Sequence, residues 1–160
     1  MSNSKLFVGV IWYNLIISII AIILYLPNFV SSVLSAPFSI FLVSITLLVV
    51  DGVRLVFSIS LVKNRKSISS SIVLLVYLFF QAFYCNIHGK VYLFNVGPKI
   101  TIIYNNAVKS IVDFSFSFWS QDFNFSIDRT DVFYFGFNLI PLFVGVVMLF
   151  EIIKNIKRLS

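Results

Sequence analysis

Charged residues are scarce in this sequence. Only 11% of its 160 residues are Asp, Glu, Lys or Arg, whereas 59% are hydrophobic. Soluble domains carry roughly 25% charged residues, and a water-soluble fold of this size cannot bury so much apolar surface. The composition therefore excludes an ordinary soluble domain and indicates that lipid is the main solvent of the chain.

The sequence also has one cysteine and one histidine. Cys85 cannot form an intramolecular disulfide, and His88 has no neighbouring set of Cys, His or carboxylate ligands of the kind that a metal site requires. No nucleophile–base pattern accompanies the serines, and glycine-rich phosphate loops are missing. We therefore expect no metal site, no cofactor and no enzymatic activity.

What the chain does contain is long apolar runs. Four of them approach the ~20 residues needed to cross a bilayer core of about 30 Å, and they cover residues 6–26, 38–60, 69–85 and 132–153. In lipid every backbone amide must be hydrogen-bonded internally, so each run is expected to be helical. The first run is longer than the apolar part of a signal peptide and follows only Lys5, so we interpret it as a retained helix. The sequence thus predicts an all-α membrane protein, a four-helix transmembrane bundle forming a single domain over residues 1–160.

The net charge of +6 is unevenly placed along the chain. The loop 63–66 and the tail 154–160 are basic, the linker 27–37 has no charge, and segment 86–131 has four basic and four acidic residues. By the positive-inside bias, both termini are expected in the cytoplasm, or in the matrix if the membrane is mitochondrial. The basic charge is therefore interpreted as a topology signal, and no nucleic-acid partner is expected.

Segment 86–131, which this topology places outside the cytoplasm, has the composition of strands. The run "KVYLFNVGPKITIIY" predicts a hairpin around Gly97 and Pro98. The stretches "FSFSFW" and "FNFSI" alternate with period two and predict two more strands joined at "SQD", and "NNAVKSIVDF" before them is compatible with a short helix. We expect a small β-rich extracytoplasmic loop between the third and fourth helices.

Phenylalanines collect on one face of the last two predicted strands. They are Phe114, Phe116, Phe118, Phe123 and Phe125. A contiguous exposed apolar patch would mark an interaction site. Three covers are possible at this stage, namely the chain's own helix ends, a partner protein, or the lipid headgroup layer.

Each predicted helix carries polar or small residues at three- and four-residue steps, which places them on one face. The polar positions of this kind in three of the helices are Asn14, Gln81 and Asn138. Small and polar groups gather at helix–helix contacts in membranes. We expect these faces to converge in the bundle core.

The most unusual polar residues are Asp51 and Arg54, which interrupt the second apolar run. Their spacing lets them pair along one helix face, and a lone charge there costs about 2.5–3.5 kcal/mol on insertion scales. Three interpretations remain open: a packing pair directed toward Asn14 or Gln81, part of an ion or substrate path, and a pair completed by another subunit. Gly52 between them is expected to allow close approach of a neighbouring helix.

Two functions are compatible with these features. The first is a non-enzymatic membrane protein that binds a larger membrane protein, as an accessory, assembly or immunity-type factor, through its helix faces and the phenylalanine-rich loop. The second is an oligomeric pore or carrier subunit lined by the intramembrane polar residues. The expected surroundings are therefore the lipid bilayer and either a membrane protein partner or further copies of the chain.

Overall fold

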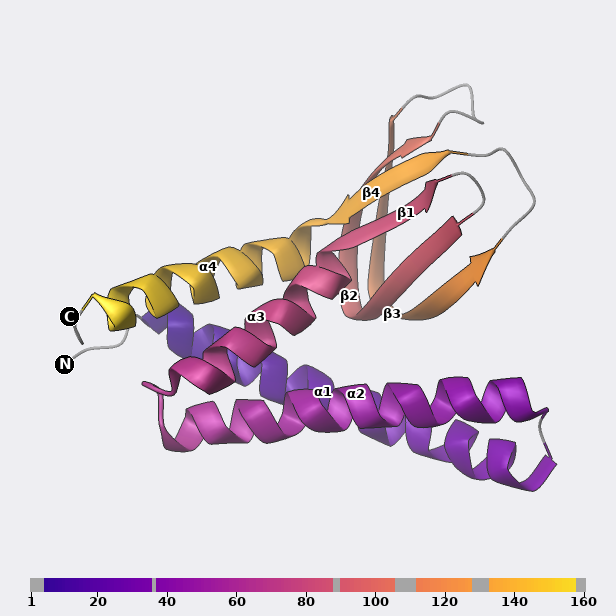
Figure 1. Ribbon diagram of the computed structural model, residues 1–160, viewed down its shortest axis with the longest axis horizontal. Helices are drawn as coiled ribbons and strands as arrows, with labels where there is room; N and C mark the ends of the chain where they lie inside the picture. The colour runs from indigo at the N-terminus through magenta and orange to yellow at the C-terminus, as the bar shows by residue number, and fades with distance from the viewer. Residues whose placement is uncertain (1–4, 36, 88–89, 106–111, 128–132, 158–160) are drawn as a thin grey trace. The chain divides into compact units, whose positions relative to one another are not determined.

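A computed structural model describes residues 5–35, 37–87, 90–105, 112–127 and 133–157. Its elements follow the order α1 (Lys5–Ser35), α2 (Phe38–Lys63), α3 (Ile68–Ala82), β1 (Phe83–Ile87), β2 (Lys90–Asn105), β3 (Val112–Ile127), β4 (Tyr134–Asn138) and α4 (Leu139–Ile156) (Figure 1). The chain forms two compact units. The first contains residues 1–75 and 147–160, and the second contains residues 76–146.

The expected all-α bundle with a small loop is wrong. The structure combines four helices with a four-stranded antiparallel sheet that is a sizeable part of the molecule. The predicted helices 69–85 and 132–153 extend too far, because residues 83–85 belong to β1 and residues 134–138 form β4. Periodicity alone does not separate a buried strand from a buried helix in an apolar run, and these aromatic segments favour strands.

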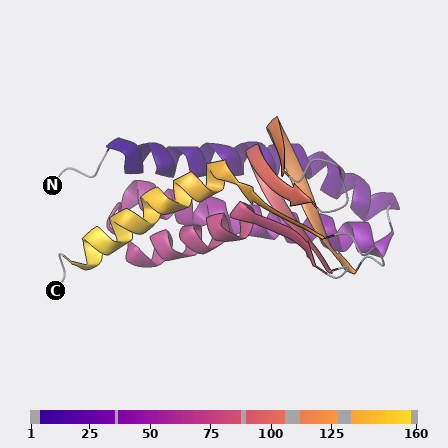
Figure 2. The ribbon, with the colours of Figure 1, turned by 90° about the horizontal axis from the view of Figure 1, so that it is seen from above.

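In the first unit, α1 and α2 are the longest helices and run side by side in opposite directions (Figures 1 and 2). The helix α2 follows Pro37, whose carbonyl accepts a hydrogen bond from the amide of Phe41. The next helix, α3, begins after Ser67, whose hydroxyl accepts the amide of Ser70 and so caps a free N–H group.

Three of the described helices, α1, α2 and α4, are long and apolar enough to cross a membrane. The remaining helix, α3, has 15 residues and is shorter than these. Leucine, isoleucine, valine and phenylalanine side chains are exposed along all four helices.

The sheet in the second unit has the strand order β1-β4-β2-β3, with a further pairing between β1 and β2. The strand β2 pairs with β1 at its start and with β4 at its end, and β3 pairs with β2 along almost its whole length. Since β1 also pairs with β4, these three strands close a ring with β3 on its outer side.

The predicted hairpin at Gly97 and Pro98 is also wrong, since β2 continues through both residues. A bulge lies there instead: Gly97 pairs with Ser120 and Lys99 with Ser117, so β3 has one residue more than β2. Gly97 has a φ of 116°, which a residue with a side chain rarely adopts. The extra residue bends the hairpin and leaves Pro98, which lacks an N–H group, outside the regular ladder.

The predicted turn at "SQD" does not form, because residues 112–127 are one strand. The helix expected at 105–114 is not present at either end, since Asn105 belongs to β2 and Val112–Phe114 belong to β3. Its centre, 106–111, lies outside the described residues, as does His88.

Candidate functional site

A polar cluster lies between α1 and α2 in the first unit. Asn14, Asp51 and Arg54 are fully buried. The guanidinium Nε of Arg54 donates a hydrogen bond of 3.0 Å to Oδ1 of Asn14, and its Cζ lies 5.8 Å from the ring centroid of Tyr13. The structure therefore brings the arginine of α2 onto two neighbouring side chains of α1.

Three further hydrogen bonds of this cluster run from a side chain to a carbonyl of the same helix. Asn14 Nδ2 donates to the carbonyl of Val10 at 2.9 Å, and Ser18 Oγ donates to the carbonyl of Asn14 at 2.7 Å. On α2, Ser58 Oγ donates to the carbonyl of Arg54 at 2.8 Å.

The cost of burying Arg54 in an apolar helix can be compared with the free energy that its contacts contribute. Insertion of arginine at mid-helix costs about 2.5–3.5 kcal/mol. A hydrogen bond to a charged group contributes roughly 1.5–3 kcal/mol, and a desolvated cation–π contact contributes up to about 2 kcal/mol. The contacts of Arg54 with Asn14 and Tyr13 are together of the size of that cost, and both of them join α2 to α1.

The expectation for Gly52 is not met. A Cβ built at Gly52 meets no atom of a neighbouring helix within 4 Å among the residues that the structure describes.

The two remaining polar residues singled out in the sequence lie in the other unit, and one of them, Asn138, belongs to a second polar cluster. Asn138 Nδ2 donates to Oδ1 of Asn95 at 2.7 Å, and Asn138 Oδ1 accepts the amides of Ile100 and Ile140 at 3.2 Å each. Gln81 Nε2 donates to the hydroxyl of Tyr77 at 3.0 Å.

Asn138 therefore does not lie on a helix face, where the sequence analysis expects it. It is the last residue of β4 and the N-cap of α4, since its side chain accepts the amide of the second helical residue. It also holds the amide of Ile100, next to the bulge of β2. Asn95, its buried partner, was not identified from the sequence, because a single asparagine in a strand pattern has no distinctive signal.

The sheet has two faces of opposite character, and the strand register defines both. Directly paired residues lie on the same face of a sheet. We call "aromatic face" the two rows that cross all four strands, namely Phe83–Phe137–Ile102–Phe114 and Cys85–Phe135–Tyr104–Val112. Tyr84, Asn86, Thr101 and Asn138 alternate with these rows, and all four are buried.

Three phenylalanines of β3 are the most exposed large hydrophobic side chains among the described residues of the sheet. Phe114 and Phe116 are each 70% exposed and Phe118 is 84% exposed. Phe123 and Phe125 pair with Phe94 and Tyr92, but their side chains lie outside the described part of the structure. Within that part, nothing from the chain covers the first three, which we call the β3 phenylalanines.

Gly136 explains how the opposite face packs so closely. It pairs with Tyr84 on one side and Ile103 on the other. A Cβ at Gly136 would lie 2.6 Å from Cε2 of Tyr84, so the tyrosine ring occupies the space above the glycine.

Outside the sheet interior, Tyr92 fixes the start of β2 to α3. Its hydroxyl donates to the carbonyl of Phe80 at 2.7 Å. Burial raises the pKa of Tyr92 to about 12, with a smaller contribution from Cys85, so its phenol remains a donor at neutral pH.

No group of three or more His, Cys, Asp or Glu side chains that could hold a metal occurs among the described residues. Comparisons with protein-family models, with curated proteins and with solved structures find no match to this chain. The functional argument therefore depends on the geometry of the chain itself.

Proposed function

We propose that this chain is a non-catalytic integral membrane protein that binds a larger membrane protein through the β3 phenylalanines. Both termini lie in the cytoplasm, or in the matrix if the membrane is mitochondrial. Membrane insertion is supported by three helices long and apolar enough to span a bilayer.

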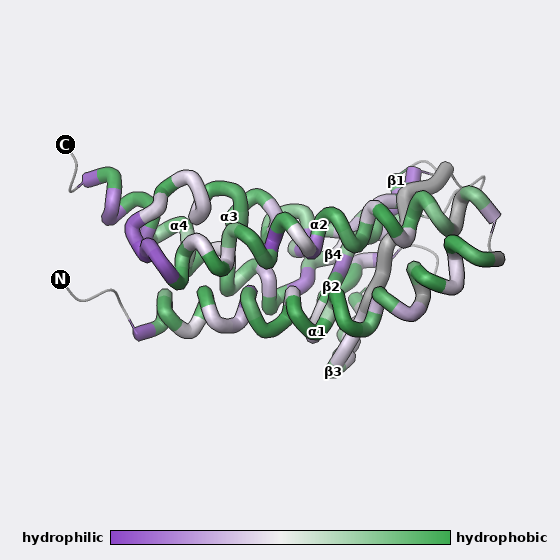
Figure 3. Tube along the Cα trace, turned by 90° about the horizontal axis from the view of Figure 1, so that it is seen from below, coloured by the Kyte–Doolittle hydropathy of each residue, from purple (hydrophilic) through white to green (hydrophobic). Residues whose placement is uncertain are grey.

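The orientation is supported by where the basic residues lie in the first unit. The start of α1, the turn between α2 and α3, and the end of α4 lie at one end of that unit, and the hydrophilic colour gathers there in Figure 3. The basic residues of these segments are Lys5, Lys63, Arg65, Lys66, Lys154 and Lys157. Such a concentration at one end is typical of the cytoplasmic side. Glu151 neutralises part of it, with its Oε1 3.8 Å from Nζ of Lys154.

The observation that carries the binding proposal is the exposure of the β3 phenylalanines. They lie on the strand at the edge of the sheet, which pairs only with β2 in the described residues. Burial of one phenylalanine side chain in an interface contributes roughly 1.5–3 kcal/mol. Three exposed phenylalanines close together on an edge strand therefore form a binding patch for an apolar protein surface.

The alternative function, an oligomeric pore or carrier, receives less support from the polar cluster of the first unit. Asn14, Asp51 and Arg54 have no exposed surface, and the arginine is held by side chains of the adjacent helix. A conducting path would need such groups to face water.

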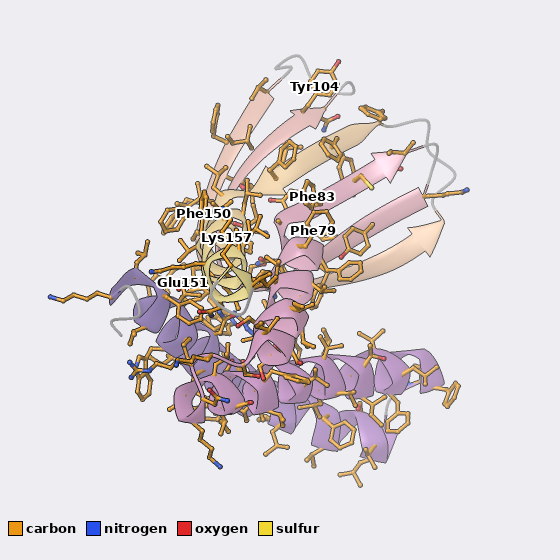
Figure 4. The ribbon with its side chains drawn as sticks, turned by 60° about the vertical axis from the view of Figure 1, so that its left-hand side comes forward. Phe79, Phe83, Tyr104, Phe150, Glu151 and Lys157 are labelled. Atoms are coloured by element: carbon orange, nitrogen blue, oxygen red, sulfur yellow. The ribbon has the colours of Figure 1, made fainter. Side chains whose placement is uncertain are left out.

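Photo-crosslinking in native membranes tests the binding proposal. A benzophenone amino acid at Phe116 is expected to form one defined protein adduct. The Phe114→Ala variant, added as a competitor, should not prevent this adduct, because it lacks part of the binding patch. Phe150 on α4 is a matched control, since it is 69% exposed but belongs to an apolar membrane helix (Figure 4). The same probe at Phe150 should give lipid adducts.

Stability measurements separate binding from folding. Phe116→Ala should abolish co-purification of the crosslinked protein and leave the unfolding midpoint of the purified chain unchanged, because the side chain is exposed. A chain that purifies alone from crosslinked membranes, with only lipid adducts at Phe116, contradicts the proposal. Flux through vesicles that is lost in Asp51→Asn would favour the pore.

The topology has its own test. In a Cys85→Ser background, a cysteine at Ser67 should react with an impermeant reagent only from the cytoplasmic side. A cysteine at Lys90, which is exposed at the start of β2, should react only from the opposite side. The reverse pattern contradicts the assigned orientation.

A further inference from the structure

The helix α3 is too short to cross a bilayer by itself. Its 15 residues span about 22 Å at 1.5 Å per residue, whereas the hydrocarbon core is about 30 Å thick. The helix α4 has 18 residues and spans about 27 Å. The chain continues from α3 directly into β1, and β4 leads directly into α4.

The missing length corresponds to the start of the sheet. Three residues of β1, at about 3.3 Å each, add roughly 10 Å and bring the apolar length to about 32 Å. Phe83 in β1 pairs with Phe137 in β4, and Cys85 pairs with Phe135. These rows of the sheet therefore lie where the apolar layer ends.

A continuous series of aromatic rings joins α3 to the sheet at this level. The ring centroids of Phe79 and Phe83 lie 4.6 Å apart, and Figure 4 shows the two side chains at the junction of α3 and β1. The centroid of Phe83 is 5.3 Å from that of Phe137, which is 4.8 Å from that of Phe135. We call these four residues the proximal aromatic cluster.

The polarity of the sheet is the reverse of that expected in water. An antiparallel sheet that faces water usually has polar side chains on its open face and apolar ones inside. Here the paired rows of the aromatic face have no charged side chain, and Phe114 in the first row is 70% exposed, whereas Asn86 and Asn138 are buried on the other face.

The backbone in this region also meets the requirement of an apolar solvent. Residues 83–86 of β1 pair with β4, and residues 134–138 of β4 pair with β1 or β2. Strand pairing bonds the amide groups internally, as the hydrocarbon region demands.

We propose that the proximal aromatic cluster contacts lipid acyl chains at the outer boundary of the bilayer, so that the first residues of β1 and the last residues of β4 lie inside the membrane. The inference rests on the membrane insertion proposed above and is independent of the partner of β3. The occupant is lipid because the cluster continues the exposed apolar side of α3, on which Ile72 and Val76 precede Phe79 at helical spacing.

Depth-dependent quenching of a single tryptophan tests this proposal. The full chain, with Trp12→Phe and Trp119→Phe, receives Phe83→Trp and is reconstituted in phosphatidylcholine vesicles whose acyl chains carry bromine. Bromine quenches only a tryptophan in contact with the chains. The matched control is Ile87→Trp, which lies on the same face of β1 but about 13 Å further from α3.

We expect Phe83→Trp to lose most of its emission in brominated vesicles, and Ile87→Trp to keep most of it and to be quenched by iodide from the water. Phe135→Trp, on the neighbouring strand, gives the same reading if Phe83→Trp does not fold. A chain that resists carbonate extraction while Phe83→Trp and Phe135→Trp are quenched only by iodide overturns the inference and leaves membrane insertion intact.

Two other outcomes also overturn it. Blue-shifted emission with neither quencher acting means that protein covers the cluster. Equal bromine quenching at positions 83 and 87 means that the whole strand is immersed and that the assigned depth is wrong. Loss of vesicle integration, by contrast, contradicts the membrane location itself and is recognised by carbonate extraction.

Discussion

Gly136→Ala gives the sharpest test of how β1 and β4 pair. The added Cβ would lie 2.6 and 2.8 Å from Cε2 and Cδ2 of Tyr84 and 3.0 Å from Cγ1 of Ile103. Carbon atoms in contact normally stay about 3.5–4.0 Å apart, so the methyl group overlaps the ring by roughly 1 Å. Tyr84 is buried, so its ring cannot simply turn into solvent.

Relief of this overlap requires the strands to separate or the ring to leave its rotamer. Overpacking of this type typically costs about 1–3 kcal/mol. In a chain of this length each kcal/mol corresponds to about 2–4 °C in Tm. We therefore expect Gly136→Ala to lower the midpoint of thermal unfolding in detergent by several degrees.

Gly52→Ala is the matched control, because the same methyl group there meets nothing within 4 Å. In a helix interior alanine is favoured over glycine by about 1 kcal/mol, so this variant should be neutral or slightly stabilised. Adding Tyr84→Leu to Gly136→Ala should cost less than the sum of the two single changes. Equal unfolding midpoints for Gly136→Ala and Gly52→Ala would refute the pairing of Tyr84 with Gly136.

Three further outcomes are expected. Arg54→Met leaves Asp51 as a buried charge and should destabilise the purified chain by about 3–5 kcal/mol, whereas adding Asp51→Leu should restore much of the loss; chemical denaturation in detergent measures both. Asn138→Ala removes the cap of α4 and should cost about 0.5–2 kcal/mol, plus the penalty for leaving Asn95 without its partner. Asn138→Asp keeps the oxygen that caps α4 and should therefore lower the free energy of unfolding less than Asn138→Ala does, if the cap is the larger of the two contributions. The raised pKa of Tyr92, about 12 against 10 for a free tyrosine, means that its contribution to stability is constant below pH 10 and is lost as pH rises toward 12; Tyr92→Phe should remove that alkaline slope, and a tyrosinate absorbance titration that finds no phenol near 12 would contradict it.

Some of the candidate site follows from local spacing. The alternation of "FSFSFW" predicts that Phe114 and Phe116 share a face, and the register places both opposite residues of one face of β2. Helical spacing likewise puts Asp51 and Arg54 on one side of α2, where both are buried. In both cases the relevant residues are within a few positions of one another, so the period of the backbone is sufficient.

The extent of the strands could not be obtained in this way. The pairing of Phe83 with Phe137 joins positions 54 apart in sequence, and either segment alone is equally compatible with the end of an apolar helix. The bulge could not be predicted from local sequence either. Gly97 and Pro98 favour a turn locally, but they become part of a long strand because β3 pairs beside them. Local spacing likewise predicts Asn138 on a helix face, whereas it lies at the end of β4.

From the sequence alone we could predict that parts of the chain are long and apolar enough to cross a bilayer, and we could locate its charges along the chain. Transfer of apolar side chains and charges between water and lipid depends on composition and on runs of about twenty residues, and both are visible in one dimension. Only the tertiary structure decided that two apolar runs change from helix to strand, that Asn14 receives Arg54, and that the sheet turns its phenylalanines outward. Strand pairing and side-chain contacts satisfy hydrogen bonds between distant residues, and their free energies have no signature in any single segment.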